Sequence, residues 1–390
     1  MENRSVSAVI CEFNPLHTGH EKALRCASME GTAPVVCILS GNFVQRGEPA
    51  LYSKWLRTEA ALRCGADLVI ELPLPWAMAG AETFARGGVY LAAALGCTQL
   101  VFGSECGDIE PLQKAAAYLN SQAFTDDLHN APAEEHTLPF ASRRELVLAN
   151  ALGADAACVV QKPNNTLAVE YCKAIESLAL PVRPVTLTRV GTPHDGEIDG
   201  NTASASALRK LIECGKFNEA SRFMPDAAKN VFIGQSTASA KQLEKAVFYG
   251  LRTARKEDFL TVPDIGEGIE NRILDAAGKA ETLEELYRLV KSKRYSHARI
   301  RRIVFSHFLG IRATPELPPY LRVLGMNKTG ASLLQNATLP VLTKTAELRN
   351  MSEECRMLFE LESRADDIYA LAFEKNNAAG SNQRHGMILL

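Results

Sequence analysis

One stretch near the start of the chain constrains the fold more than any other: Val9-Ile-Cys-Glu-Phe-Asn-Pro-Leu-His-Thr-Gly-His-Glu-Lys-Ala23. It begins with an apolar run that is typical of a buried strand. Asn14-Pro15 ends this run, because a residue before proline is kept in an extended or turn conformation. Thr18-x-x-Glu21 then has the spacing of a capping box, which predicts a helix from about Gly19. A strand, a tight turn and a helix N-terminus together favour anion binding, since backbone N–H groups and the positive end of the helix dipole face outward.

Two histidines, His17 and His20, lie three residues apart at this helix start. Residues at that spacing share one face of a helix, with Cβ atoms roughly 5–6 Å apart. Histidine can donate to phosphate oxygens and stabilise the charge that develops on an α-phosphate during adenylyl transfer. A chance pair or part of a metal site is the alternative, but the accompanying glutamate and an obvious third ligand are missing. We therefore predict a nucleotide-phosphate site that carries out chemistry, and assign no residue as a metal ligand.

The composition sets further bounds. At 390 residues the chain can form two domains with substantial cores. A formal net charge of −2 excludes a global basic field, so binding of nucleic acid would require a local basic patch. The ten cysteines include no Cys-x-x-Cys pair, which favours a reducing compartment over a disulfide framework or a zinc site. The first residues leave no room for a signal peptide, and no apolar run approaches the roughly 20 residues of a membrane span. We expect a cytoplasmic protein with no membrane association.

Apolar runs that alternate with amphipathic helical patterns predict an α/β fold with a doubly wound parallel sheet. Ligands bind such sheets beyond the carboxyl ends of the strands, near the point where the strand order reverses. Small, polar or ionisable residues occur at those ends, at 14–20, 41–42, 71 and 103–105. The predicted strands span 8–11, 34–39, 67–73, 99–102 and 182–187, and the predicted helices 18–29, 53–64, 82–95, 111–120 and 142–152.

Beyond about residue 210 the strand signal nearly vanishes. Helical patterns occur at 242–252, 269–276, 283–290, 296–309 and 353–373, and residues 376–385 have the composition of a frayed tail. We therefore expect two domains, an α/β domain at 1–210 and a mainly α-helical domain at 211–390.

A second candidate phosphate site lies just before this boundary, in Thr202-Ala-Ser-Ala-Ser-Ala-Leu-Arg209. Ser206 can cap a helix that begins at Ala207, which places Arg209 in the first turn. A cation there opposes the helix dipole, and a bound anion such as a triphosphate tail would resolve the conflict. A solvated surface arginine is an equally good interpretation.

Two further polar segments can each be interpreted in two ways. The loop at 191–200, rich in glycine and acidic residues, is either a lid over the site or a mobile connection. Asn164 and Asn165 precede a helix expected from about Thr166, and either residue can cap that helix or hydrogen-bond a nucleotide.

Positive charge concentrates in the helical half, between Lys291 and Arg302, with a tyrosine inside the segment. Contacts from lysine and arginine to phosphates, with stacking on Tyr295, would suit a folded RNA. A solvated helix face is the more common role of such a charge run. The candidate RNA-binding residues are Lys291, Lys293, Arg294, Tyr295, Arg299, Arg301 and Arg302.

Seven short segments of the chain form a distinctive set of motifs. They are Glu12-Phe-Asn-Pro-Leu-His-Thr-Gly-His20, Ser40-Gly-Asn-Phe-Val-Gln-Arg-Gly-Glu-Pro-Ala50, Gly65-Ala-Asp-Leu-Val-Ile-Glu-Leu-Pro73, Phe84-Ala-Arg-Gly87, Phe102-Gly-Ser-Glu105, Lys162-Pro-Asn-Asn165 and Leu324-Gly-Met326. Together they resemble one known family, the bacterial tRNA(Met) cytidine acetate ligases, which are a branch of the histidine-motif nucleotidyltransferase superfamily. The short His-x-Gly-His element specifies only the superfamily, whereas the segment at 40–50 is much more specific.

The resemblance implies a Rossmann-like nucleotidyltransferase fold and a two-step reaction. The enzyme would activate acetate with ATP, giving acetyl-adenylate and pyrophosphate, with Mg²⁺ bridging the phosphates. It would then transfer the acetyl group to the exocyclic amine of the wobble cytidine in elongator tRNA(Met), giving N4-acetylcytidine without acetyl-CoA. Residues 1–210 would be the ATP-binding catalytic domain, and residues 211–390 the tRNA-binding domain.

The resemblance also implies residue roles. His17 and His20 would hold the phosphates and stabilise the α-phosphate transition state, helped by the Gly19 and His20 amides. Ser204, Ser206 and Arg209 would hold the β- and γ-phosphates. The ATP-binding residues would be Ile10, Cys11, Glu12, Phe13, Asn14, Pro15, Leu16, His17, Thr18, Gly19, His20, Glu21, Lys22 and Ala23, together with Gly103, Asn164 and Arg189. Arg189 follows from the resemblance alone.

Two other functions remain open. A small-molecule adenylyltransferase or cytidylyltransferase could use the same histidine motif, but it has no need of a helical domain with a basic segment. The other is a nucleotide-gated RNA-binding protein without catalysis. The intact His17 and His20 argue only weakly against it, because nucleotide binding also uses them.

Overall fold

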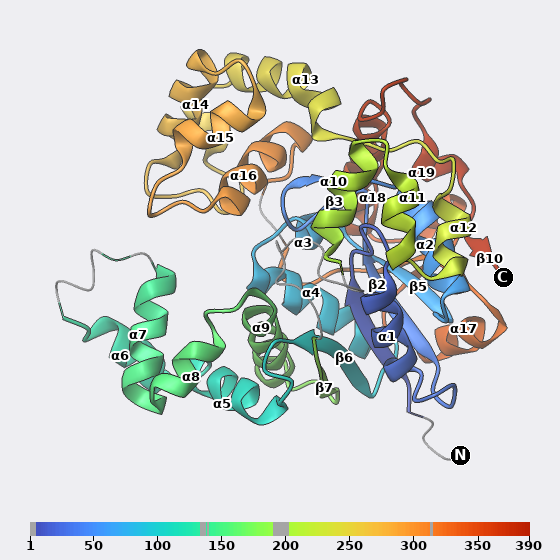
Figure 1. Ribbon diagram of the computed structural model, residues 1–390, viewed down its shortest axis with the longest axis horizontal. Helices are drawn as coiled ribbons and strands as arrows, with labels where there is room; N and C mark the ends of the chain where they lie inside the picture. Colours follow the sequence, from blue (N-terminus) through green and yellow to red (C-terminus); the bar gives the residue numbers. More distant parts are fainter. Residues whose placement is uncertain (1–4, 133–137, 139, 190–202, 313–314) are drawn as a thin grey trace.

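A mostly parallel sheet forms the centre of the molecule (Figure 1). The computed structural model describes residues 5–132, 138, 140–189, 203–312 and 315–390. The strand order is β10-β8-β5-β2-β1-β6-β7, and the five strands from β5 to β7 run parallel. These are β1 (Ser7–Cys11), β2 (Val35–Ser40), β5 (Leu68–Leu72), β6 (Gln99–Ser104) and β7 (Arg183–Thr188). The predicted doubly wound α/β fold is confirmed, with the order reversing between β1 and β6.

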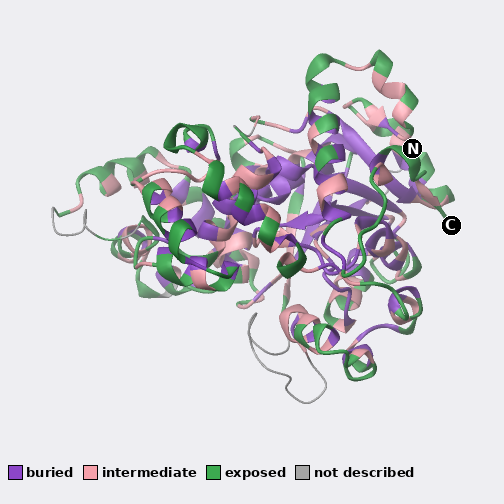
Figure 2. Cartoon of the chain, turned by 90° about the horizontal axis from the view of Figure 1, so that it is seen from above, coloured by how far each residue is buried: buried purple, intermediate pink, exposed green. Residues whose placement is uncertain are grey.

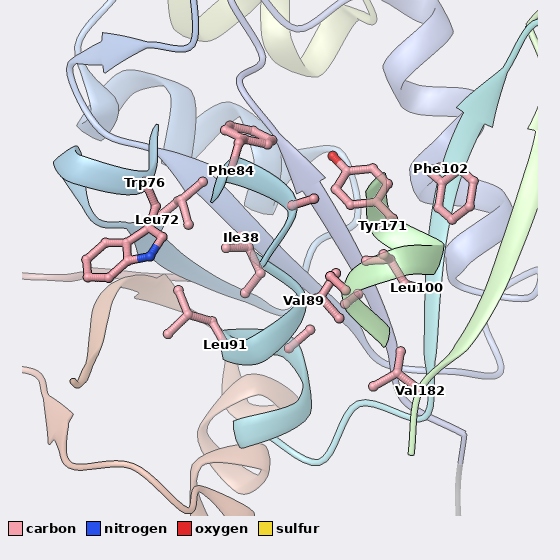
Figure 3. Packing of buried hydrophobic residues seen from close by; sticks show 14 of the residues in the cluster. Ile38, Leu72, Trp76, Phe84, Val89, Leu91, Leu100, Phe102, Tyr171 and Val182 are labelled. Atoms are coloured by element: carbon pink, nitrogen blue, oxygen red, sulfur yellow. The ribbon is translucent and has the colours of Figure 1, made fainter. Parts of the chain in front are cut away.

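Helices cover both faces of the sheet, which explains why the strands are continuously apolar rather than alternating. Val36 and Ile38 of β2 face one layer, whereas Val35, Cys37 and Leu39 face the other. Figure 3 shows the first layer, where Ile38 packs near Val89 and Leu100. That layer contains α4 (Ala81–Ala94), α5 (Ile109–Leu119) and α9 (Pro163–Ser177), and the second contains α1 (Thr18–Ala27), α2 (Lys54–Arg63), α10 (Ala205–Glu213) and α12 (Asp226–Phe232). Figure 2 shows the buried strands at the centre of the molecule.

Smaller elements complete this half of the molecule. A two-stranded antiparallel hairpin, β3 (Phe43–Val44) and β4 (Glu48–Pro49), follows β2. The remaining helices here are α3 (Leu74–Ala77), α6 (Gln122–His129), α7 (Phe140–Leu152), α8 (Ala154–Val159) and α11 (Phe217–Ala220), with the 3-10 turn η2 (Ser221–Phe223).

A helical bundle follows, as the periodicity predicts, and packs against the hairpin. Its helices are α13 (Ala240–Thr253), α14 (Ile269–Lys279), α15 (Leu283–Val290) and α16 (His297–Leu309), with η3 (Lys256–Phe259). Its apolar core also includes Phe43 of the hairpin and Tyr369 of α18 (Glu353–Tyr369). The bundle therefore shares a core with the rest of the molecule, and stands at one side of it in Figure 1.

The expectation that strands nearly vanish beyond residue 210 is wrong for the last part of the chain. β8 (Leu321–Met326) pairs antiparallel with β5, and β10 (Ile388–Leu389) and β9 (Val341–Leu342) pair with β8. Arg322 and Gly325 interrupt the apolar pattern of β8, so the strand was not evident from the sequence. Residues beyond 320 thus return to the sheet that we assigned to 1–210. The other elements are α17 (Lys328–Leu333), η4 (Leu334–Asn336), η5 (Thr345–Asn350) and α19 (Ser381–Arg384).

The expected frayed tail at 376–385 is also wrong. Asn382 is only 1% exposed, and its side chain accepts from Lys54 Nζ at 3.0 Å and donates to Ser363 Oγ at 3.1 Å. This segment therefore belongs to the packed structure. Within the described part of the chain, no helix has the length and apolar character needed to cross a membrane.

Candidate active site

The helix α1 begins in the loop that follows β1, and a histidine caps it. We predicted Thr18 and Glu21 as the capping box, but the cap lies one residue earlier. His17 Nδ1 accepts from the Gly19 N–H at 3.0 Å, and His20 Nδ1 accepts from the His17 N–H at 3.3 Å. Since a backbone N–H is always a donor, both Nδ1 atoms are acceptors. The proton of each neutral imidazole therefore lies on Nε2, which becomes a hydrogen-bond donor.

The two imidazole rings stack on one another. Their centroids lie 3.8 Å apart at an interplanar angle of 29°, with His17 buried and His20 half-buried. A Cβ at residue 19 would come within 2.8 Å of His17 Cε1, so glycine is required for this arrangement. We expected the Gly19 and His20 amides to act on the phosphate, but they donate to His17 Nδ1 and to the His17 carbonyl. These two amides are therefore used within the protein, and the imidazole rings remain the expected phosphate donors.

The turn before the histidines is tied to more distant segments. Asn14 Oδ1 accepts from the Leu51 N–H at 2.8 Å, and Arg209 Nη1 donates to the Asn14 carbonyl at 2.9 Å. Phe13 is buried with φ 46°, a left-handed conformation that costs free energy and is common at functional sites. Its ring lies 5.1 Å from that of His20. The structure thus brings Arg209 against the histidine turn.

A second cluster joins the end of β6 to the start of α9. Asn164 Nδ2 and N–H donate to Glu105 Oε1 at 2.6 and 3.1 Å, and Arg189 Nη1 donates to Asn164 Oδ1 at 2.6 Å. At Gly103, a Cβ would lie 2.9 Å from Arg189 Cγ. The three expected nucleotide contacts at 103, 164 and 189 therefore lie together. Because α9 starts at Pro163, neither Asn164 nor Asn165 is its N-cap, and both lie in its first turn.

The Glu105 carboxylate binds both asparagines of this cluster, and we did not predict it as a site residue. Its Oε2 accepts from the Asn165 N–H at 2.7 Å, and Asn165 Oδ1 accepts in return from the Glu105 N–H at 2.8 Å. Partial burial alone would raise the pKa of Glu105, but the hydrogen bonds from Asn164 and Asn165 outweigh it and lower the pKa. The ionised Glu105 carboxylate therefore accepts hydrogen bonds from two backbone N–H groups in the first turn of α9. Its position directly after a predicted strand was the available signal.

The helix α10 starts two residues before our prediction. Ser204, not Ser206, is its N-cap, and Ser204 Oγ accepts from the Ala207 N–H at 3.1 Å. Arg209 consequently lies in the second turn, where its Nη2 is 3.5 Å from Glu48 Oε1. The loop at 191–200 and Thr202 lie outside the described residues.

Arg57 fixes the loops that surround the site, and sequence reasoning did not find it. It is fully buried, and its guanidinium donates to the carbonyls of Glu12 (2.7 Å), Ser40 (2.9 Å), Tyr52 (2.9 Å) and Gly41. The carbonyls of Glu12, Ser40 and Gly41 lie at the ends of β1 and β2, so one side chain holds the two strand ends together. An arginine within an amphipathic helix is normally read as solvent-facing, which concealed this role.

A buried ionic cluster, centred on Lys54, lies beside these loops. Lys54 Nζ is 2.8 Å from both Glu71 oxygens and 2.9 Å from Asp366 Oδ2. Burial alone would lower the pKa of Lys54, but the carboxylates of Asp366 and Glu71 outweigh it and raise the pKa. Asn42 joins the cluster by donating to Asp366 Oδ1 at 2.8 Å. Glu71, which we placed near the ligand site, is thus used for internal ion pairing.

The basic segment divides into two sets. Lys291, Lys293 and Arg294 are exposed in the loop between α15 and α16. Tyr295 is 4% exposed and its hydroxyl donates to the Glu267 carbonyl at 2.7 Å, so the expected base stacking on this ring is wrong.

The arginines of α16 belong to the second set and make ion pairs. Arg299 lies 3.3 Å from Glu267 and Arg302 lies 2.7 Å from Asp264. Arg301 lies 3.3 Å from Glu284 and 3.7 Å from Glu48. In the described residues, no group of three or more His, Cys, Asp or Glu side chains could hold a metal ion.

The doubly wound sheet and the paired imidazole donors define a nucleotidyl transferase. The family described as HIGH Nucleotidyl Transferase matches residues 4–384. The tRNA(Met) cytidine acetate ligase of Thermoanaerobacter sp. (strain X514) is 35% identical, covering 99% of this chain and 100% of that protein. The tRNA(Met) cytidine acetate ligase of Caldanaerobacter subterraneus subsp. tengcongensis is 36% identical, covering 94% of this chain and 95% of that protein. The chain therefore belongs to the tRNA(Met) cytidine acetate ligase family.

Solved structures agree with this assignment. The crystal structure of apo Thermotoga maritima TmcAL superposes with a TM-score of 0.93 at 26% identity, covering 99% of both chains. The structure of the same protein bound with alpha-thio ATP gives a TM-score of 0.91 at the same identity and coverage. The family resemblance drawn from the sequence motifs is confirmed.

Proposed function

We propose that this protein activates acetate with ATP and acetylates a cytidine of tRNA(Met). Family membership over the whole chain supports this function. In its finer form, the acceptor is the exocyclic amine of the wobble cytidine in elongator tRNA(Met), the product is N4-acetylcytidine, and acetyl-CoA takes no part. The observation that carries the proposal is the stacked pair of imidazole donors at the start of α1.

In the first step a carboxylate oxygen of acetate attacks the α-phosphorus of ATP, and the bond to the β-phosphate bridging oxygen breaks. Acetyl-adenylate and pyrophosphate result. Negative charge builds on the α-phosphate oxygens, where the Nε2–H groups of His17 and His20 donate. Because backbone amides hold both Nδ1 atoms, these donors are oriented before ATP binds.

In the second step the cytidine N4 attacks the acetyl carbonyl carbon, and the bond to the adenylate oxygen breaks. AMP leaves with that electron pair, and N4 loses one proton. AMP is a good leaving group, so the requirement on the protein is to position the amine and keep water away from the mixed anhydride.

The remaining ATP contacts are assigned by position. Gly103, Asn164 and Arg189 form one cluster that we assign to the nucleotide. Ser204, Ser206 and Arg209 are assigned to the β- and γ-phosphates, supported by the contact between Arg209 and the histidine turn. Mg²⁺ would accompany ATP and neutralise the negative charge of its phosphates.

The tRNA surface is assigned to residues 211–390, with the ATP site in residues 1–210. Lys291, Lys293 and Arg294 support this, since they are exposed together at one end of the bundle. The same function places the protein in the cytoplasm, away from membranes.

Transfer of labelled acetate to tRNA tests the proposal. Wild-type protein with ATP, Mg²⁺, labelled acetate and tRNA(Met) is expected to label the tRNA, and His20→Ala is expected to lose this activity while keeping its circular dichroism spectrum. The matched control is His129→Ala, which removes an exposed imidazole on α6.

Three results would contradict the proposal. The first is consumption of ATP without labelled tRNA, which would indicate a small-molecule nucleotidyltransferase. The second is labelling that requires acetyl-CoA. The third is full labelling by His20→Ala, which would remove the histidine pair from the chemistry.

A further inference from the structure

The face of α13 that points to solvent carries an exposed aromatic ring. Tyr249 is 73% exposed, whereas the opposite face of the helix is buried in the core of the bundle through Leu243, Val247 and Leu251. A single exposed apolar side chain is common on a protein surface and needs no explanation by itself. The residues around Tyr249 therefore decide what this ring can do.

Two lysines precede Tyr249 on the same side of the helix. Lys245 lies one turn before it and Lys241 two turns before it, about 6 and 12 Å away along the helix axis. Both lysines are exposed, and neither makes an ion pair within the described part of the chain. Their charges therefore remain available to an anionic partner.

No carboxylate of α13 offsets this charge on the exposed face. Glu244 is the acidic residue of the helix, and its Oε2 accepts from the Leu283 N–H at 2.7 Å, toward α15. Arg252 adds a fixed cation, because its Nε and Nη2 donate to the carbonyls of Ala277 and Ala280 at 3.0 and 3.1 Å. The face thus combines one bare ring with positive charge of a single sign.

The start of α13 is anchored to the catalytic half of the molecule, the sheet and the helices that cover it. The Ala238 N–H donates to the Leu51 carbonyl at 2.8 Å, and the Leu51 N–H donates to Asn14 Oδ1 at 2.8 Å. Asn14 lies three residues before His17, so two hydrogen bonds connect this end of the helix with the histidine turn. Figure 1 shows α13 along the upper edge of the bundle.

We propose that this face of α13 binds an unpaired stretch of RNA, with one base stacked on Tyr249 and the adjoining phosphates bound to Lys241 and Lys245. The inference rests on the proposed function, in which the acceptor is the wobble cytidine and therefore belongs to the single-stranded anticodon loop. Unpaired RNA is recognised by stacking of its bases on aromatic rings and by cations along its backbone. A double helix offers the ring no free base, and an apolar protein surface would leave the lysines without partners.

The stacked base is a neighbour of the acceptor rather than the acceptor itself. Because α13 is tied to the histidine turn at its start, a loop held on its outer face has a fixed position relative to the catalytic half. The helix therefore positions the anticodon loop as well as attracting it.

Binding of tRNA(Met) to the full-length protein, measured by fluorescence anisotropy at several salt concentrations, tests this surface. Tyr249→Ala is expected to raise the Kd about 5-fold or more without changing the slope of log Kd against log salt, since stacking releases no counterions. Tyr249→Phe keeps the ring and is expected to stay within about 2-fold of wild type. Replacing Lys241 and Lys245 together by Gln is expected to reduce the slope by about 1.4, about 0.7 for each lost phosphate contact.

Matched controls come from other surfaces of the chain. Met357→Ala removes an apolar side chain that is 64% exposed on α18. Replacing Lys216 and Lys279 together by Gln removes two exposed lysines that already pair with Glu219 and Asp275. Both controls are expected to keep the wild-type Kd and the wild-type salt slope.

Several outcomes would overturn the inference. One is wild-type affinity for tRNA in Tyr249→Ala with an unchanged circular dichroism spectrum. Another is an equal loss of affinity in Tyr249→Ala and Tyr249→Phe, which would assign the effect to the hydroxyl rather than to the ring. A third is a changed oligomeric state of Tyr249→Ala in size-exclusion chromatography with unchanged tRNA affinity, which would assign the face to contact between copies of the chain.

Failure of the proposed function would look different. The binding assay contains neither ATP nor acetate, so it tests the α13 surface whether or not acetylation occurs. A wild-type protein that binds tRNA(Met) through Tyr249 but transfers no labelled acetate would refute the proposed function and support the RNA-binding face.

Discussion

The substitution Lys54→Met removes the cation that contacts both Glu71 and Asp366 in the buried cluster described above. Lys54 is 0% exposed, and Glu71 and Asp366, which it contacts at 2.8 and 2.9 Å, are 3% and 4% exposed. Methionine approximates the length of the side chain, so packing changes little while two buried carboxylates lose their partner. Breaking a buried pair in this way costs about 3–5 kcal/mol of unfolding free energy.

The loss should depend on pH in a defined direction. Burial raises the pKa of Glu71, and Lys54 counteracts this. Without Lys54 the folded-state pKa of Glu71 rises further above the unfolded value of about 4. A raised folded-state pKa gives stability that is fully present below the unfolded pKa and is lost as the pH rises. The difference between variant and wild type should therefore be smaller at pH 5 than at pH 8.

Denaturant unfolding followed by tryptophan fluorescence measures this difference. Both tryptophans of the chain report on this half, and Lys54 Nζ lies 5.4 Å from the Trp55 ring centroid. The control is Arg63→Met, which breaks an exposed pair with Glu59 and should cost less than about 1 kcal/mol. A loss below about 1 kcal/mol for Lys54→Met at pH 8, or an equal loss at both pH values, would refute the reasoning.

Three further outcomes are expected. Gly47→Ala, at φ 73°, puts a Cβ 2.5 Å from the backbone of α16 and should lower the Tm. The control is Gly234→Ala, at the same φ but with no atom within 4 Å of the added Cβ, and its Tm should fall much less. Equal Tm values for the two variants would show that the hairpin does not pack tightly on α16. Glu105→Gln should lower the free energy of unfolding above about pH 4. This loss, measured by unfolding at several pH values, should shrink as the pH falls through the lowered pKa of Glu105. A loss that does not depend on pH would contradict the role of an ionised Glu105. Replacing Lys293 and Arg294 by Gln should weaken tRNA binding and reduce the slope of log Kd against log salt by about 2; an unchanged affinity would remove this loop from the RNA surface.

The catalytic half could be predicted well because its signals are local. Continuous apolar runs mark strands that are buried on both faces, and the Asn14-Pro15 break marks the end of β1. The helix starts were less accurate. A histidine replaces the usual Ser, Thr or Asp as the cap of α1, and Ser204 and Ser206 are equivalent in sequence terms as caps of α10.

Long-range features were not predictable from the chain order. Glu105 acts only through a helix that begins more than fifty residues later, and Arg57 only through carbonyls of two separate loops. The bundle segment illustrates the same limit, since spacing revealed its charge but not that Tyr295 faces the core. Pairing and burial of charged residues depend on tertiary contacts, which a single sequence does not display.

The return of the chain to its first sheet has a consequence for synthesis on the ribosome. β5 emerges early, but its partner β8 comes after the whole bundle, and Asn382, which completes the shell of Lys54, comes later still. Until then one edge of the nascent sheet has unpaired backbone groups, a state prone to aggregation. The bundle consists of consecutive helices, but its apolar core also needs Tyr369 of α18, which comes later in the chain. A chain stopped after the bundle would therefore leave both the edge of the sheet and the core of the bundle incomplete.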